Sequence, residues 1–243
     1  MRSGRAPLLA DTGGTDAPGQ CPMGYNAVIF DLDGTLLDTL DDLAAAANRV
    51  LKSNGYPTHE HDAYRWFIGH GSAVLIERAL PPERRTPEII AACLGALLDD
   101  YNRNWHCATR PYDGIGELLA ALLRLHRPMA VVTNKPHHFT GQMIRYYFPE
   151  VPFQAVLGQR DGVAKKPDPV QALAAARAMV VAPAACVFLG DSAVDMETAR
   201  RGGMLPVGAG WGFRPRAELV DAGAVRVLDH PLELTDLLDP LGP

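Results

Sequence analysis

Apolar runs and amphipathic helical patterns alternate along the chain from Pro111 onward. Short apolar runs bounded by turn residues predict strands, and the longer patterns between them predict helices. This alternation is typical of βαβ units, which build an α/β fold with a parallel sheet and helices on both faces. The expected strands are 27–30, 128–134, 153–158, 186–192 and 205–210, and the expected helices between them are 137–148, 167–179 and 194–203.

The segment between the first of these strands and Pro111 contains helical patterns only. The first predicted helix follows Thr39 and is closed by Gly55, with Thr39 and Asp42 as its expected capping box. Three further helical patterns follow, and about seventy residues in all are too many for a loop. We therefore expect an all-helical cap domain at 39–109, inserted into a core formed by 24–38 and 110–238.

Composition and charge restrict the partners of the protein. The 243 residues carry a formal net charge of -5, whereas a general nucleic-acid binder carries a basic field. No apolar stretch approaches the roughly 20 residues that cross a bilayer, and the four cysteines show no metal-binding spacing. We expect reduced thiols, a cytoplasmic location, no nucleic-acid or membrane partner, and a monomer or homodimer. Residues 1–23 are rich in Gly, Pro and Ala and are expected to form a disordered tail.

Polar side chains follow three of the expected strands. The segment NAVIFDLDGT places Asp31 and Asp33 at the exit of the first strand, separated by one leucine. Thr133 ends the strand that begins at 128, and Asp191 ends the strand that begins at 186. In parallel α/β sheets, ligands bind outside the carboxyl ends of the strands. These four residues are therefore expected to share one active site.

The residue types in this site suit phosphoryl transfer. The paired carboxylates offer a nucleophile and a general acid/base, while the Thr133 hydroxyl and the Asn134 backbone N–H suit phosphate oxygens. Lys166 adds a point positive charge, and GDSAVD supplies Asp191 and Asp195, four residues apart. Carboxylates at this density indicate a hard, oxygen-loving cation, for which Mg²⁺ is the usual choice. The expected ligand is a small phosphorylated metabolite.

Each of these residues also has a simpler interpretation. Thr133 could be an ordinary buried strand residue, Lys166 a solvated surface lysine like its neighbour Lys165, and Asp191 a helix N-cap. DLDG alone resembles the start of a calcium-binding loop, but that loop needs further oxygen ligands and a glutamate at its twelfth position. The occurrence of all the features in order favours the active-site interpretation.

The motifs DLDGTLLDT, VVTNKP, KKPDP and GDSAVD resemble the four motifs of the haloacid dehalogenase-like hydrolase superfamily. The resemblance covers nearly everything after residue 24. It implies a Rossmann-like, doubly wound core, a helical cap inserted after the first motif, and Mg²⁺-dependent hydrolysis.

The resemblance also implies a role for each matching residue. Asp31 is the expected nucleophile and Asp33 the expected general acid/base, and Thr133 and Lys166 are expected to bind phosphate. The implied metal ligands are Asp31, the backbone carbonyl of Asp33, and Asp191, while Asp195 supports the metal waters or Lys166. Gly34, Thr35 and Asn134 complete the core side of the expected substrate site.

Asp33 separates the subclasses of this family on chemical grounds. A halide leaving group needs no proton, whereas the leaving oxygen of a phosphate ester does. The stretches WFIGHGSAVLIERAL, RPYDGI and TNKP resemble phosphoglycolate phosphatases. Within the cap, IGHGS places glycines before a helix N-terminus, where free N–H groups favour a small carboxylate such as that of 2-phosphoglycolate. The expected cap contacts are Gly69, His70, Gly71 and Ser72.

Other functions stay open at this point. IGHGS could be a turn capped by Ser72 that never touches substrate. RPY and DHPLEL also resemble the N-acetylmuramic acid 6-phosphate phosphatases, and other sugar phosphates fit the same architecture. A β-phosphoglucomutase-like isomerase would need cap cations for a second phosphate, and the loop offers none except His70. A non-catalytic phosphate-binding module would have no need of the nucleophile.

Overall fold

The computed structural model describes Met1 and residues 24–238, so the tail predicted at 1–23 lies, after Met1, outside the described residues. Its core is a parallel sheet with the strand order β5-β4-β1-β6-β7-β8. The five expected strands are confirmed, and the three-residue β8 is an addition too short to give a pattern in the sequence. The strands are β1 (Ala27–Phe30), β4 (Met129–Pro136), β5 (Ala155–Gln159), β6 (Cys186–Gly190), β7 (Leu205–Ala209) and β8 (Arg226–Leu228).

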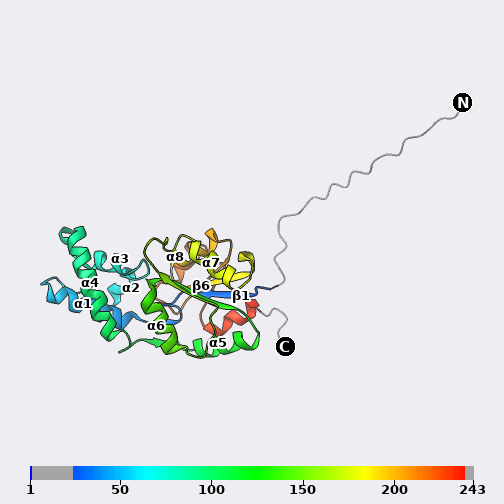
Figure 1. The fold of residues 1–243 in the computed structure, drawn as a ribbon, viewed down its shortest axis with the longest axis horizontal. Coiled ribbons are helices and arrows are strands. Elements are labelled where there is room, and N and C mark those ends of the chain that lie inside the picture. Colours follow the sequence, from blue (N-terminus) through cyan, green and yellow to red (C-terminus); the bar gives the residue numbers. More distant parts are fainter. Residues whose placement is uncertain (2–23, 239–243) are drawn as a thin grey trace.

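Helices cover both faces of this sheet, as expected for a doubly wound fold (Figure 1). Because successive strand residues face opposite sides, Val28 and Phe30 pack in the cluster that contains α5 and α6 residues, whereas Ile29 packs in the cluster that contains α7 residues. The core helices are α5 (Ile115–Arg124), α6 (His137–Tyr147), α7 (Val170–Ala178), α8 (Ala193–Arg201), α9 (Arg216–Asp221) and α10 (Thr235–Leu238), with 3-10 turns at Pro183–Ala185 and Pro231–Leu234.

Four helices within residues 40–104 form a separate layer at the left of Figure 1. They are α1 (Leu40–Ser53), α2 (Tyr64–Phe67), α3 (Ser72–Ala79) and α4 (Pro87–Asn104), with 3-10 turns at His61–Ala63 and Pro82–Arg84. A two-stranded antiparallel ribbon of β2 (Leu37–Asp38) and β3 (Arg110–Pro111) joins this layer to the core. The helical cap is therefore present, while its division at 39–109 stays a prediction.

The expected capping box at the start of α1 is wrong. Thr39 is the N-cap of α1, but its side chain makes no capping hydrogen bond and donates to Asp33 Oδ1 at 2.9 Å. The Asp42 carboxylate accepts hydrogen bonds from the backbone N–H groups of Ala108 and Thr109, at the far end of the cap. Both side chains are buried, and these distant partners satisfy them in place of the local helix terminus.

The largest hydrophobic cluster runs from the sheet into the cap. It contains Phe30 of β1 and Leu118 of α5 together with Leu75 of α3 and Leu97 of α4. The ring of Tyr101 in α4 meets the ring of Phe139 in α6 edge to face, with centroids 5.1 Å apart. Cap and core are thus joined by apolar packing as well as by the ribbon. Within residues 24–238, no helix combines the length and the apolar character needed to span a membrane.

Candidate active site

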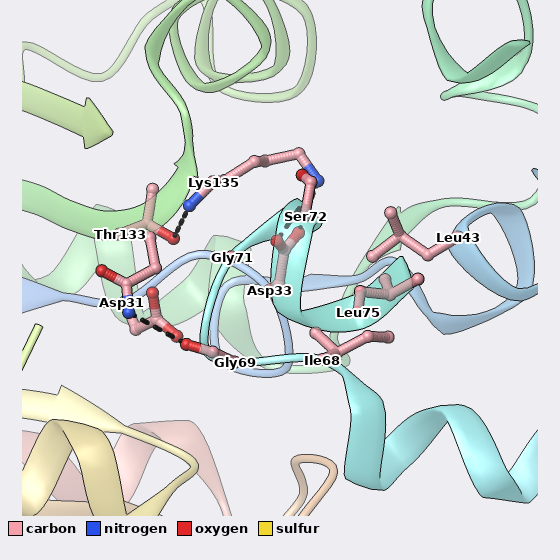
Figure 2. A pocket seen from close by; sticks show the side chains of 11 residues that line it. Asp31, Asp33, Leu43, Ile68, Gly69, Gly71, Ser72, Leu75, Thr133 and Lys135 are labelled. Carbon is pink, nitrogen blue, oxygen red and sulfur yellow. Dashed lines mark hydrogen bonds and ion pairs between the residues drawn. The ribbon is translucent and has the colours of Figure 1, made fainter. Parts of the chain in front are cut away.

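Three adjacent strands bring the predicted acidic and hydroxyl groups together at one edge of the sheet. Asp31 follows β1 directly, Thr133 lies in the neighbouring β4, and Asp191 follows β6 on the other side of β1. Asp31, Asp33 and Thr133 line a pocket beneath the cap (Figure 2). The sequence spacing predicted this gathering because parallel strands end at the same edge.

Lys166 lies at the centre of the buried charges. Its ammonium is 2.7 Å from Asp31 Oδ1 and 2.6 Å from Asp195 Oδ1. Burial lowers the pKa of this lysine, but the two carboxylates more than offset burial and hold its pKa above the ordinary value. Burial also raises the pKa of Asp31 to about 6, against the opposing effect of Lys166. Lys166 is therefore a fixed cation beside the expected nucleophile, and not a solvated surface lysine.

Asp195 is fully occupied in holding Lys166 and the start of α8. Its second oxygen accepts hydrogen bonds from the backbone N–H and the hydroxyl of Ser192, at 3.1 and 2.6 Å. Ser192 is the N-cap of α8 and forms a capping box with Asp195. The alternative interpretation of Asp191 as that N-cap is therefore wrong. The Asp191 carboxylate is therefore available to the active site.

The Asn134 side chain forms hydrogen bonds with the backbone of Lys166. Its Oδ1 accepts from the Lys166 backbone N–H at 2.9 Å, and its Nδ2 donates to the Lys166 carbonyl at 3.1 Å. The same Nδ2 donates to the carbonyl of Gly69 in the cap, at 3.0 Å. This side chain therefore joins the lysine loop to the cap loop. Phosphate binding by the Asn134 backbone N–H stays a prediction.

The buried carboxylates have the donor atoms and the charge that suit a hard cation. One oxygen each from Asp31, Asp191 and Asp195 lies within 4.8 Å of the others, and all three residues are buried. Asp31 Oδ1 has the Lys166 ammonium as its ion-pair partner. Burial and the neighbouring carboxylates raise the pKa of Asp191 well above its ordinary value. One lysine among three buried carboxylates leaves excess negative charge, which a hard divalent cation would offset.

Gly34 makes room for this cluster. Its φ is +84°, and a Cβ atom at this position would lie 2.2 Å from Asp191 Oδ2. Asp191 Oδ2 also accepts a hydrogen bond from the Phe213 backbone N–H at 2.7 Å. The neighbouring Thr35 contributes its carbonyl, which accepts from Trp211 Nε1 at 3.0 Å. Neither Gly34 nor Thr35 lines the pocket. Their contacts are with Asp191 and Trp211, and direct contact with substrate stays a prediction.

The Asp33 side chain points away from the acidic cluster. Its Oδ1 accepts from Thr39 and from Lys135 Nζ, both at 2.9 Å. Lys135 Nζ also donates to the Tyr101 hydroxyl of α4 at 3.0 Å. Burial lowers the pKa of Lys135, but Asp33 and Tyr101 more than offset this and hold that pKa above its ordinary value. Lys135 was not among the predicted site residues, although it stands next to Asn134 in the TNKP motif.

The cap loop supplies the opposite wall of the pocket. Gly69, Gly71 and Ser72 line it, whereas His70 does not. Gly71 has a φ of +92° and is the N-cap of α3, so the interpretation of Ser72 as the cap is wrong. A Cβ atom on Gly71 would lie 3.3 Å from the carbonyl oxygen of Asn134. The glycine thus allows the loop to approach β4 closely.

Arg214 is a second residue that the sequence did not reveal. It extends from the loop after β7, and its Nη2 donates to the carbonyl of Ile68 at 3.1 Å. Its Nη1 donates to the carbonyl of Arg65, and its guanidinium lies 4.8 Å from the centroid of the Trp66 ring. A core residue therefore holds the segment that leads into the cap loop. Its partners lie far away in sequence, so these contacts were not predictable from the residues around Arg214.

A model of one protein family matches residues 28–209, and that family is described as haloacid dehalogenase-like hydrolase. The chain belongs to the haloacid dehalogenase-like hydrolases. The family expected from the four motifs is confirmed.

Relatives of this haloacid dehalogenase-like hydrolase cover nearly all of its described length. It is 35% identical over 222 residues to an N-acetylmuramic acid 6-phosphate phosphatase of Pseudomonas aeruginosa, covering 89% of this chain and 96% of the relative. It is 34% identical over 199 residues to a phosphoglycolate phosphatase of Pseudomonas putida, covering 81% and 72%. A crystal structure from Lactobacillus delbrueckii matches with a TM-score of 0.83 at 28% identity, covering 89% of this chain and 99% of that one.

Proposed function

We propose that the protein is a Mg²⁺-dependent phosphatase of a small phosphate monoester, with 2-phosphoglycolate as the favoured substrate. The observation that carries the proposal is the Asp31 carboxylate, which lies between the fixed cation Lys166 and a pocket also lined by Asp33 and Thr133. A module that only bound phosphate would gain nothing from a buried carboxylate facing the anion. Relatives named as phosphatases of phosphate monoesters support the reaction class.

The proposed reaction proceeds through an aspartyl-phosphate. An Asp31 oxygen forms a bond to phosphorus while the ester P–O bond breaks, and protonated Asp33 gives its proton to the leaving oxygen. A water then attacks the phosphorus of the intermediate as the bond between the Asp31 oxygen and phosphorus breaks. Asp33 takes the proton of that water, inorganic phosphate leaves, and both residues are restored. Lys166 holds Asp31 in place during both steps, and the Thr133 hydroxyl binds a phosphate oxygen.

The cation in this proposal is Mg²⁺, which Asp31 and Asp191 of the acidic cluster would hold. The Asp33 backbone carbonyl would be the further ligand that the family resemblance implies. When bound, it would neutralise charge on the phosphate and on the buried carboxylates. Asp195 has both oxygens engaged by Lys166 and Ser192, so its proposed role is to orient Lys166.

N-acetylmuramic acid 6-phosphate is a second candidate, because the site opens into a wide groove. This groove of about 670 Å³ shares Gly71, Ser72 and Asn134 with the inner pocket and is also lined by Arg160 and Lys165. A two-carbon leaving group would leave most of the groove empty, whereas an amino sugar would occupy it. The ratio of kcat/KM for the two phosphate esters distinguishes these candidates.

We also propose a cytoplasmic location, which is the compartment that keeps thiols reduced. Within the described residues, Cys93, Cys107 and Cys186 are free, and Cys93 and Cys186 are buried.

The first test is a panel of phosphate monoesters assayed with Mg²⁺ against the wild type and Asp31→Asn. The variant is expected to lose far more than the roughly 10²- to 10³-fold that follows removal of one stabilising donor, because an amide does not attack phosphorus. Circular dichroism and thermal melting check that the variant is folded. Ordinary turnover by a folded Asp31→Asn protein would contradict the covalent mechanism.

A further inference from the structure

We propose that Lys135 binds the carboxylate of the leaving group. This carboxylate takes the place of the Asp33 carboxylate beside the Lys135 ammonium when substrate binds. The inference rests on the proposed phosphatase function and names the residue that gives the enzyme its preference for an anionic leaving group. Lys135 is thus a specificity-determining residue on the core side of the pocket.

The Lys135 ammonium is buried in the pocket wall between cap and core. The residue is 5% exposed, and Nζ lies 2.9 and 3.2 Å from the two oxygens of Asp33 and 3.0 Å from the Tyr101 hydroxyl. Figure 2 shows its side chain arching over the pocket so that the ammonium reaches the Asp33 carboxylate beside Ser72. The cation therefore lies in the pocket beside Asp33, the proposed acid for the leaving oxygen.

The closed ion pair leaves too little space for a substrate. The inner pocket holds about 30 Å³, which is room for roughly two water molecules. Asp33 and Lys135 both line it, so separation of these two side chains would enlarge the space for a phosphate monoester. Substrate binding is therefore an exchange of contacts and does not simply fill a cavity.

Charge determines which leaving groups can make this exchange. Asp33 must turn from Lys135 toward the leaving oxygen to act as the general acid. Among the described residues, Asp33 is the carboxylate in contact with the Lys135 ammonium, and Tyr101 alone would leave that buried cation without a counter-charge. A carboxylate on the leaving group restores the counter-charge, and a neutral alcohol does not.

The N-terminus of α3 borders the same position. Ser72 begins this eight-residue helix and lines the pocket with Lys135. Free backbone N–H groups at a helix N-terminus favour an anion. The helix and the ammonium together form a site for a carboxylate that either feature alone would not define.

The test compares 2-phosphoglycolate with ethyl phosphate, which has the same two-carbon length and no carboxylate. The wild type is expected to prefer 2-phosphoglycolate in kcat/KM, and Lys135→Met is expected to lower that preference roughly 10- to 100-fold. Lys52→Met, an exposed lysine on the cap helix α1, is the matched control and is expected to keep the preference. Lys165→Met tests whether Lys165, the exposed lysine of the wide groove, binds the carboxylate in place of Lys135.

A second measurement needs no variant. Glycolate is expected to inhibit wild-type hydrolysis of p-nitrophenyl phosphate competitively, and ethylene glycol of the same size is expected to inhibit far less.

Lys135→Gln, which keeps a hydrogen-bond donor for Tyr101, replaces Lys135→Met in the comparison of the two esters if Lys135→Met does not fold.

Several results would overturn the inference and leave the phosphatase proposal standing. These are equal use of both esters by the wild type, an unchanged preference in the Lys135 variant, a loss confined to Lys165→Met, or equal inhibition by glycolate and ethylene glycol. A wild type that hydrolyses no phosphate ester with Mg²⁺ would instead refute the proposed function itself.

Discussion

Asp31 is a buried charge whose surroundings favour its protonated form. Burial raises its pKa from an ordinary 3.8 to about 6 in the metal-free protein, although Lys166 opposes the rise. The folded state therefore binds this proton more tightly than the unfolded state. The stability that comes from this difference is fully present below pH 3.8 and is lost as the pH rises through about 6. A cation in the acidic cluster would offset this loss of stability at neutral pH.

Asp31→Asn is accordingly expected to raise the melting temperature of the metal-free protein at pH 8, and to raise it less at pH 5. A pKa change from 3.8 to about 6, which already includes the opposing effect of Lys166, corresponds to roughly 3 kcal/mol as an upper limit. Thermal melts in excess chelator measure the effect, with Asp99→Asn on the exposed surface of α4 as the control. A lower melting temperature for Asp31→Asn at pH 8 would contradict this account.

The residues of the site were predictable where a motif marks a strand end. Asp31, Thr133 and Asp191 follow this rule, and the structure places all three at one edge of the sheet. Lys135 lies at the end of β4 within the TNKP motif, but its contact with Asp33, 102 residues away, was not predictable. Arg214 likewise contacts Arg65, 149 residues away. Only the folded chain defines such contacts.

At the scale of elements, the junction between the cap loop and α3 depends on one glycine. Gly71 has a φ of +92°, which side-chain-bearing residues rarely adopt, and it lies against the Asn134 carbonyl. Ser72 and the rest of α3 take their place in the pocket from this turn. The loop was predicted to bind substrate, and its position on the pocket wall supports that prediction.

Gly71→Val is expected to lower kcat/KM for 2-phosphoglycolate roughly 10- to 100-fold, because a strained turn moves the α3 N-terminus away from the leaving group. Turnover of p-nitrophenyl phosphate is expected to change less, since the core performs the chemistry. Gly95→Val is the matched control, because Gly95 lies in α4 with no atom near the position of its Cβ. Equal losses with both substrates would show that the loop does not select the leaving group.

The boundaries of the expected strands and helices in the core were predictable to within three residues, whereas side-chain partners were not. The helix expected at 137–148 is α6 at His137–Tyr147, within one residue. Thr39 and Asp42 matched the capping pattern, yet they bond to Asp33, Ala108 and Thr109. A capping motif describes only its own turn, and here buried partners from other elements satisfied both side chains.

At the scale of the whole molecule, cap and core share one hydrophobic cluster. Leu97 of the cap helix α4 and Leu118 of the core helix α5 both belong to it, and both are almost fully buried. Two parts joined by such a cluster are expected to unfold together. The sequence predicted a helical cap and an α/β core, but it could not predict how extensively the two pack against each other.

Leu97→Ala and Leu118→Ala are each expected to destabilise the protein by roughly 2–5 kcal/mol and to shift the same single calorimetric transition. Differential scanning calorimetry of the wild type and both variants measures this. Two resolved transitions, of which Leu97→Ala moves one only, would show that cap and core unfold independently.

The β2–β3 ribbon has a consequence for how such a protein diversifies. Leu37 lies opposite Pro111, so the chain leaves the core and returns to it at neighbouring positions. Recombination could therefore exchange the whole insert without disturbing the order of the sheet. Tyr101 packs on Phe139, however, and a transplanted insert would have to match that surface. Descendants with new substrates are thus expected to differ first in the few side chains that face one another across the pocket, with the ribbon and the packing surface inherited unchanged.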